Sequence, residues 1–126
     1  MQKYLIIGNG VAGTTAAETI RRYDNAGSII IITDESFPFY SRLRLNEYIE
    51  GKINKENLII KNEKWYLEHN IDLMLDTQIV SADTKNKTAL TREGKNISYD
   101  SLLVATGSHS FVPPIKGSKK RRFCIA

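Results

Sequence analysis

The sequence predicts an α/β fold in which a parallel sheet is joined by crossover helices and carries an inserted antiparallel β-meander. Three features support this prediction: an apolar run at residues 4–7 that ends in glycines, four consecutive isoleucines at residues 29–32, and an apolar run at residues 101–105. Continuous apolar runs of this length are typical of strands buried on both faces of a parallel sheet. A helical pattern lies between the first two runs, so strand, helix and strand form a βαβ unit in about 30 residues.

The first helix is expected at residues 11–23, directly after the first strand. Small residues recur there at helical spacing, and Asn25 and Gly27 end the segment. The second strand follows at residues 28–33, where the isoleucines give the strongest strand signal in the chain. This strand ends in an acidic pair.

Two further helices are expected after a loop. Ser41 is placed to cap a helix over about residues 42–50, and a second helix is expected over residues 63–69. The aromatic residues of the second helix, Trp65 and Tyr66, are expected to pack in the core.

The last third of the chain reads as short strands. Alternating segments separated by polar turns predict a strand that leads into a small antiparallel meander; they lie at residues 71–74, 78–82, 87–91 and 96–99. The apolar run at 101–105 then returns the chain to the central sheet. Residues 1–115 are therefore expected to form one domain.

Composition restricts the class of protein. A chain of 126 residues with 41% hydrophobic and 25% charged residues fits one ordinary globular domain. No apolar run approaches the roughly 18 residues of a membrane span, so membrane-spanning, collagen-like and disordered classes are excluded. The single cysteine, Cys124, excludes an intramolecular disulfide and a cysteine zinc cluster. We expect a cytoplasmic protein without a targeting segment.

The net charge of +4 comes from the end of the chain. The sequence has 18 basic and 14 acidic residues, and five of the basic ones lie in residues 116–126, so residues 1–115 carry a net charge of −1. The body of the protein is therefore not expected to bind nucleic acid. Residues 116–126 are expected to be a disordered basic tail.

A glycine-rich motif follows the first expected strand and opens the first helix. It fits the pattern G-x-G-x-x-G and reads Gly8-Asn9-Gly10-Val11-Ala12-Gly13. In this pattern the first glycine permits a tight turn, the second lets the backbone approach a pyrophosphate, and the third lets helix and strand pack closely. A bound phosphate would also meet the unpaired N–H groups and the positive dipole of the helix N-terminus.

The acidic pair strengthens this interpretation. Asp34 and Glu35 follow Gly13 by 21 and 22 residues, at a position where a carboxylate accepts hydrogen bonds from the ribose hydroxyls of an adenosine. Motif and acids together predict a dinucleotide site. They leave open which dinucleotide binds and which of the two acids contacts the ribose.

Two other segments carry a resemblance to a known family. They are the segment from Tyr99 to Ser108, which contains the last expected strand and its end Ala105-Thr106-Gly107, and the loop Tyr40-Ser41-Arg42. With the glycine motif they resemble the FAD-binding half of the pyridine nucleotide-disulfide oxidoreductase superfamily, especially NADH:rubredoxin reductases and the flavin domain of the nitrite reductase large subunit. The resemblance covers about residues 2–116. It implies a Rossmann-like FAD-binding domain, which in that family includes a β-meander.

The resemblance also implies which residues bind FAD. Arg42 matches a basic position that contacts the cofactor, and its fork of donors suits a pyrophosphate; the backbone of Ile79 matches a position at the adenine. The predicted cofactor-binding residues are Gly8, Gly10, Val11, Ala12, Gly13, Asp34, Glu35, Arg42, Ile79, Ala105, Thr106 and Gly107. No catalytic residue and no metal ligand is predicted, and His69 and His109 are expected to be surface residues.

Two positions depart from the family pattern. Leu43 stands where thiol-reactive members have a redox cysteine, and Glu47 stands where ferredoxin-reductase relatives have a lysine beside the flavin. The resemblance therefore implies hydride and electron transfer by the flavin itself, which the protein positions and tunes. In a full-length form the electrons would pass from NAD(P)H through FAD to a rubredoxin-like or other acceptor.

Length is the largest departure. Full-length relatives continue with an NAD(P)H-binding domain, and the last six residues here do not resemble that continuation. We expect the chain to be a fragment or to end in an altered reading frame, and to be inactive alone. The alternative is a non-catalytic module that binds FAD, NAD or an adenine nucleotide. No membrane partner is expected, and the oligomeric state is open.

Overall fold

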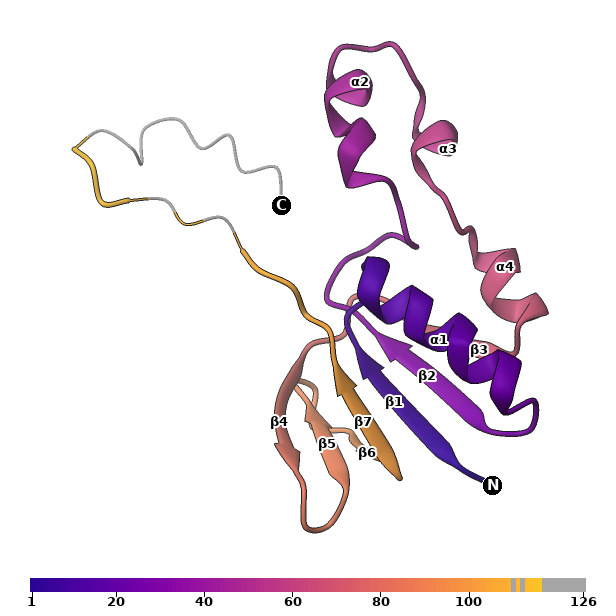
Figure 1. Cartoon of the computed structure of the whole chain (residues 1–126). Helices are drawn as coiled ribbons and strands as arrows, with labels where there is room; N and C mark the ends of the chain where they lie inside the picture. Colours follow the sequence, from indigo (N-terminus) through magenta and orange to yellow (C-terminus); the bar gives the residue numbers. More distant parts are fainter. Residues whose placement is uncertain (110, 112, 117–126) are drawn as a thin grey trace.

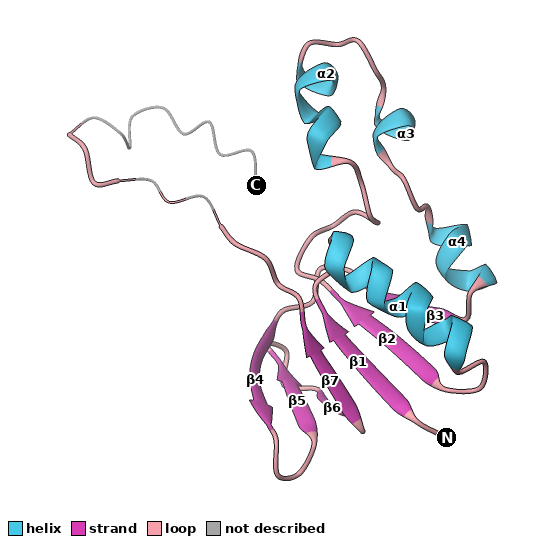
Figure 2. Ribbon diagram, viewed as in Figure 1, coloured by secondary structure: helices cyan, strands magenta, loops and turns pink. Residues whose placement is uncertain are grey.

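The computed structural model describes residues 1–109, 111 and 113–116 (Figure 1). Cys124 and, apart from Lys116, the expected basic tail lie outside these described residues. The described chain has a parallel sheet with helices on one face and a three-stranded meander on the other (Figure 2). The predicted α/β class with an inserted antiparallel meander is confirmed.

Four parallel strands form the main sheet in the order β3-β2-β1-β7. Their bounds are Lys3–Ile7 for β1, Ser28–Ile32 for β2, Ile71–Met74 for β3 and Ser101–Val104 for β7. The apolar runs of β1 and β2 predicted buried strands, and the structure confirms this. Five of their side chains are at most 1% exposed: Leu5, Ile6, Ile29, Ile31 and Ile32. The last strand pairs with the first, as expected.

One face of the sheet is covered by helices α1 (Val11–Tyr23) and α4 (Glu63–Glu68). Ile6 of β1 packs there with Ala17 of α1 and Tyr66 of α4, and all three are at most 1% exposed. Small residues on the sheet side of α1 allow this close approach. Tyr66 is a core residue, as the sequence predicted.

Arg21, near the end of α1, fastens the two helices together. Its guanidinium donates to the carbonyl oxygens of His69 at 2.9 Å and Asn70 at 2.8 Å, just beyond α4. It also donates to the carbonyl oxygens of Asp24 at 3.0 Å and Gly27 at 2.9 Å, in the turn that follows α1. One side chain thus satisfies the backbone at the ends of both helices.

The opposite face of the sheet is covered by the meander. Leu5 and Ile32 pack there with Ala89, Ile97 and Tyr99, all buried. The meander strands are antiparallel in the order β4-β5-β6, with bounds Ile79–Asp83, Thr88–Thr91 and Asn96–Ser98. They match the expected segments to within one or two residues.

Residues 41–60, which we call the arm, project beyond the carboxyl ends of the strands (Figure 1). The expectation of a single helix over residues 42–50 is wrong in detail. A 3-10 turn, η1 (Arg42–Arg44), precedes a short helix, α2 (Leu45–Ile49), and the Ser41 side chain makes no capping hydrogen bond. Neither element buries a residue, so packing does not impose a regular helix.

The arm returns through a helix that the sequence analysis missed, α3 (Lys55–Leu58). Asn54 caps it by accepting a hydrogen bond from the backbone N–H of Asn57 at 3.0 Å. A backbone bridge between Tyr40 and Ile59 closes the base of the arm.

Candidate functional site

A cavity of about 430 Å³ opens at the carboxyl ends of β1, β2 and β7. Residues before β4 and Arg42 from the arm complete its wall. From β1 the chain crosses to β2 on one side, whereas β7 lies on the other side of β1. In open α/β sheets a point of this kind, where the strand order reverses, is where ligands bind.

Two of the three motif glycines are required by packing. Gly8 has φ +114°, and a Cβ on it would lie 2.1 Å from the carbonyl oxygen of Ala105. A Cβ on Gly13 would lie 2.0 Å from the carbonyl oxygen of Gly8. The turn after β1 therefore touches the end of β7 directly, and α1 touches the turn.

Gly10 differs from both. Its φ of −85° is one that other residues adopt, and a Cβ built on it has nothing within 4 Å. Gly10 lines the cavity, so the chain itself does not require a glycine there. A ligand that approached the backbone closely would require it, as a pyrophosphate does in dinucleotide-binding turns.

The N-terminus of α1 adds donors to the same wall. Gly10 is its N-cap residue, no side chain caps the end, and its first turn contains no acidic residue. The first N–H groups of a helix have no partner within the helix, and here Val11 and Ala12 line the cavity. With the helix dipole, these amides favour an anion by up to ~2 kcal/mol.

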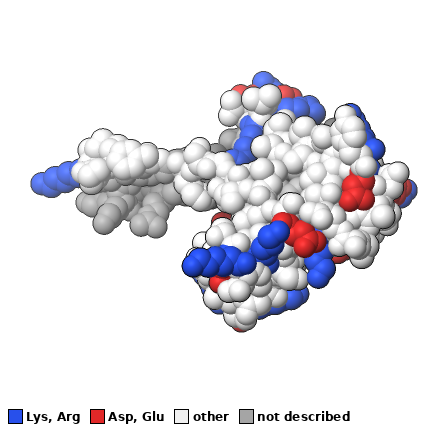
Figure 3. All heavy atoms as spheres, turned by 60° about the horizontal axis from the view of Figure 1, so that its bottom comes forward, with Lys and Arg blue, Asp and Glu red and all other residues white. Residues whose placement is uncertain are grey.

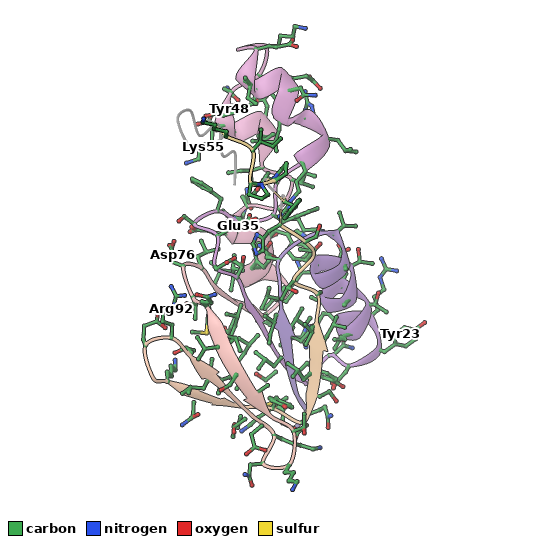
Figure 4. The ribbon with its side chains drawn as sticks, turned by 90° about the vertical axis from the view of Figure 1, so that its left-hand side faces the viewer. Tyr23, Glu35, Tyr48, Lys55, Asp76 and Arg92 are labelled. Atoms are coloured by element: carbon green, nitrogen blue, oxygen red, sulfur yellow. The ribbon has the colours of Figure 1, made fainter. Side chains whose placement is uncertain are left out.

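The acidic pair lines the same cavity, and Glu35 contacts the arm. Glu35 accepts a hydrogen bond from Arg42, with 2.7 Å between Oε1 and a guanidinium nitrogen; Figure 4 shows Glu35 below the arm. The side chains are 33% and 63% exposed, so this ion pair adds little stability. Burial, reinforced by Glu35, raises the pKa of the nearby Tyr40 hydroxyl. Asp34 is exposed and also lines the cavity.

The structure brings nearly all of the predicted site residues together. Those on the cavity wall are Gly8, Gly10, Val11, Ala12, Asp34, Glu35, Arg42, Ile79, Ala105, Thr106 and Gly107. The exception is Gly13, which lies behind the turn and packs α1 against it. That these residues bind a cofactor stays a prediction.

Several wall residues were missed by the sequence analysis: Ile7, Asn9, Ile32, Thr33, Thr77, Gln78 and His109. Ile7, Ile32 and Thr33 end or follow parallel strands beside the predicted residues, and that position was an available signal. His109 was expected to be an unremarkable surface residue; it is exposed but lines the cavity.

The chemistry of the wall suits binding rather than covalent catalysis. It contains one arginine and two carboxylates, and neither cysteine nor lysine lines it. Within the described part of the chain, no cluster of three His, Cys, Asp or Glu side chains could hold a metal ion. None of the described helices combines the length and hydropathy needed to cross a membrane.

Charged side chains are scattered over the surface. On the face drawn in Figure 3, basic and acidic residues are interspersed, and the described residues form no extended basic patch there. This distribution agrees with the balanced charge of residues 1–115.

Comparison with known families decides the assignment. A family model described as pyridine nucleotide-disulphide oxidoreductase matches residues 2–125. The chain belongs to this family. The resemblance inferred from the glycine motif and from Ala105-Thr106-Gly107 is therefore confirmed.

Curated members of the pyridine nucleotide-disulphide oxidoreductase family match almost the whole chain. An NADH oxidase of Methanocaldococcus jannaschii is 38% identical over an alignment of 119 positions that covers 90% of this chain and 27% of the relative. A nitrite reductase [NAD(P)H] of Bacillus subtilis is 33% identical over 95% of this chain and 15% of its own length. A rubredoxin-NAD(+) reductase of Pseudomonas putida is 31% identical, over 95% and 31%. The chain spans less than a third of these relatives.

Solved structures agree with the fold. The reductase in a covalent putidaredoxin reductase–putidaredoxin complex superposes with a TM-score of 0.84 at 26% identity, over 92% of this chain and 28% of that chain. NADH:rubredoxin oxidoreductase from Clostridium acetobutylicum superposes with a TM-score of 0.79 at 32% identity, over 89% and 30%. These two reductases therefore share the fold described above over most of this chain.

Proposed function

We propose that this chain is the FAD-binding portion of an NAD(P)H-dependent oxidoreductase that passes electrons from a nicotinamide through FAD to a protein or redox-centre acceptor. The observation that carries the proposal is Gly10, a glycine on the cavity wall that neither backbone conformation nor packing explains. Membership of the pyridine nucleotide-disulphide oxidoreductase family supports FAD as the dinucleotide.

The residues of the cavity fit this cofactor in kind. The turn at Gly8 to Ala12 would hold the pyrophosphate, and Arg42 would add a charged donor to it. Asp34 or Glu35 would accept hydrogen bonds from the ribose, and the backbone of Ile79 would meet the adenine. A cavity of about 430 Å³ lies within the range of cofactor pockets.

In this proposal the chain binds and orients, and the cofactor performs the redox step. Bound FAD would supply an isoalloxazine ring that takes up a hydride and gives up electrons. The strands hold the turn and the acidic pair at fixed positions, and the arm brings Arg42 to the open side. We assign no side chain of the cavity wall a role as a general acid, a general base or a nucleophile.

The acceptor and the cell compartment are proposed by analogy. Relatives named as rubredoxin reductase and nitrite reductase support a small electron-carrier protein or a redox centre as the acceptor of the complete protein. The single cysteine supports a reducing, cytoplasmic setting.

Titration of the purified chain with FAD, followed by quenching of flavin fluorescence, tests the proposal. We expect saturable binding of FAD, competition by ADP, and weaker binding of NAD. Binding of NAD without FAD would instead favour the non-catalytic dinucleotide module.

A second assay measures NADH oxidation with excess FAD and a dye acceptor, corrected for free flavin. We expect no protein-dependent turnover near ~1 per second, the low end of ordinary enzymes. The reason is that hydride transfer needs nicotinamide and flavin in contact, whereas the sequence holds one glycine-rich fingerprint.

A further inference from the structure

Asn9, between the first two motif glycines, meets a buried tyrosine. The hydroxyl of Tyr66 donates to Asn9 Oδ1 at 2.9 Å and accepts a hydrogen bond from the backbone N–H of Phe39 at 3.2 Å. Tyr66 is 1% exposed, and burial raises the pKa of its hydroxyl. This hydroxyl therefore connects the glycine turn to the loop that leads into the arm.

The proton count at Tyr66 fixes the orientation of the Asn9 amide. The N–H of Phe39 can only donate, so it uses a lone pair of the hydroxyl and leaves the single hydroxyl proton for Asn9. The amide must then present its oxygen to Tyr66, because the opposite orientation would leave that proton without an acceptor. Asn9 Nδ2 consequently points away from Tyr66.

Asn9 Nδ2 is shielded from solvent and has no hydrogen-bond partner in the described part of the chain. It is the one buried side-chain nitrogen or oxygen of this kind among the described residues. An unpaired buried donor costs free energy, and native structures keep such groups where something outside the chain satisfies them. Asn9 also lines the cavity, beside the donors of the turn and of α1.

We propose that Asn9 is a further dinucleotide-binding residue, oriented by Tyr66, and that its Nδ2 donates to a phosphate oxygen of the ligand. The proposal rests on the proposed function. A phosphate fits because the neighbouring groups of the turn are also donors facing the cavity. Because Nδ2 is shielded from solvent here, the proposal includes a small shift of the Asn9 side chain, with its oxygen still on Tyr66, that brings the nitrogen to the phosphate when the ligand binds.

Three variants separate this role from a structural one. Asn9→Ala removes the donor but also leaves the Tyr66 hydroxyl without its acceptor, so we expect both a lower Tm and an affinity for FAD and ADP reduced about tenfold or more. In the double variant with Tyr66→Phe no orphaned hydroxyl remains, and the backbone N–H of Phe39 is the group that loses its acceptor. There we expect Tm to recover partly, whereas the affinity stays low.

Tyr66→Phe alone tests the orientation. The amide of Asn9 is then free to rotate, and we expect an affinity for FAD and ADP about threefold weaker. The matched control is Tyr4→Phe, which removes a hydroxyl that donates to Asp24 at 3.1 Å and does not line the cavity. It should lower Tm without changing either affinity. Adenosine, which lacks phosphate, should bind all variants equally.

The outcomes distinguish this proposal from the proposed function. If the parent binds FAD and Asn9→Ala binds it within twofold, or if affinity recovers together with Tm in the double variant, the role of Asn9 is overturned and the proposed function stands. If the parent binds ADP but not FAD, the proposed function fails and the ADP data decide the role of Asn9. If the parent binds neither, both are overturned.

Discussion

The cavity has two walls that are built in different ways. Residues 8–13 rest against the sheet so closely that neither Gly8 nor Gly13 has room for a methyl group. The arm contributes Arg42 from a 3-10 turn in which no residue is buried, and the adjacent Leu43 is 94% exposed. Figure 4 shows Tyr48 and Lys55 on the arm, well away from the sheet.

The difference teaches which part of the site is set before a ligand arrives. Packing against β7 and α1 fixes the glycine turn, so its amide groups are already in position. The arm is held by an exposed ion pair between Glu35 and Arg42, by a few backbone hydrogen bonds at its base and by Leu58, its one buried side chain among the described residues 41–60. Segments with so few buried contacts open at low free-energy cost, so the arm can adjust to a ligand.

The largest expected effect comes from breaking the packed wall. In Gly13→Ala the new Cβ would lie 2.0 Å from the carbonyl oxygen of Gly8, and that backbone cannot move without disturbing β7. We expect the free energy of unfolding to fall by ~3 kcal/mol or more, measured by chemical denaturation. Gly10→Ala is the control and should stay within ~0.5 kcal/mol of the parent. Equal midpoints for Gly13→Ala and the parent would contradict the packing argument.

The next effect separates binding from folding on the same wall. Gly10→Val places a branched side chain in the open space at Gly10, so we expect FAD affinity to fall more than ~30-fold. The free energy of unfolding should change by less than ~1 kcal/mol, because the φ of −85° suits valine. FAD titration of the folded variant measures the first quantity and urea denaturation the second. An affinity within threefold of the parent would rule out this turn as the phosphate site.

A smaller effect is expected on the arm side. Arg42→Gln removes one cation from the open wall, so FAD should bind about fivefold more weakly and with a shallower dependence on salt. Stability should change by less than ~0.5 kcal/mol, since the ion pair with Glu35 is exposed. Arg92→Gln is the matched control, because Arg92 lies on the meander and not on the cavity wall (Figure 4). Equal losses in both variants would mean that net charge, and not Arg42, attracts the ligand.

The smallest expected effect is on the stability of the protein at acidic pH. Hydrogen bonds, first from the backbone N–H of Gly27 and then from Tyr4, hold the pKa of Asp24 below its usual value of 3.8. A carboxyl with a lowered pKa in the folded state stabilises the protein above its unfolded pKa, and this stabilisation is lost as pH falls through the folded value. Stability should therefore drop below about pH 4. Asp24→Asn should flatten this drop in urea denaturation at several pH values, and an unchanged pH profile would contradict this role of Asp24.

Much of the packed half of the molecule could be predicted from the sequence. The apolar runs at residues 4–7 and 29–32 form strands with buried centres because β-branched and leucine side chains fill both faces of a parallel sheet. The run at residues 101–105 was expected to be buried in the same way, and there the expectation is wrong: β7 is an edge strand in which Leu103 and Val104 are 39% and 63% exposed. The glycine motif predicted the turn because a Cβ at either of two of its glycines would collide with neighbouring backbone. Both signals come from local sterics, which the sequence expresses directly.

The arm and the side-chain network were harder to predict. Helix α3 has four residues and Asn54 as its main signal, too short a segment for a helical period to appear. The contact between Asn9 and Tyr66 joins residues 57 positions apart. The direction of the Asn9 side chain depends on α4, the helix that carries Tyr66. Hydrophobic periodicity does not predict which helix packs beside a given loop.

The backbone bridge between Tyr40 and Ile59 makes the arm a closed loop as seen from the sheet. The backbone N–H of Ser41 donates to the carbonyl oxygen of Leu58 at 2.9 Å. The two ends of the arm are therefore held together independently of the residues between them. The entropy of closing a flexible loop changes slowly with its length, by ~0.6 kcal/mol per doubling. Insertions or deletions within residues 50–54 should leave β1 and β2 intact. The arm is thus the part of this scaffold that can gain new surface without refolding the rest.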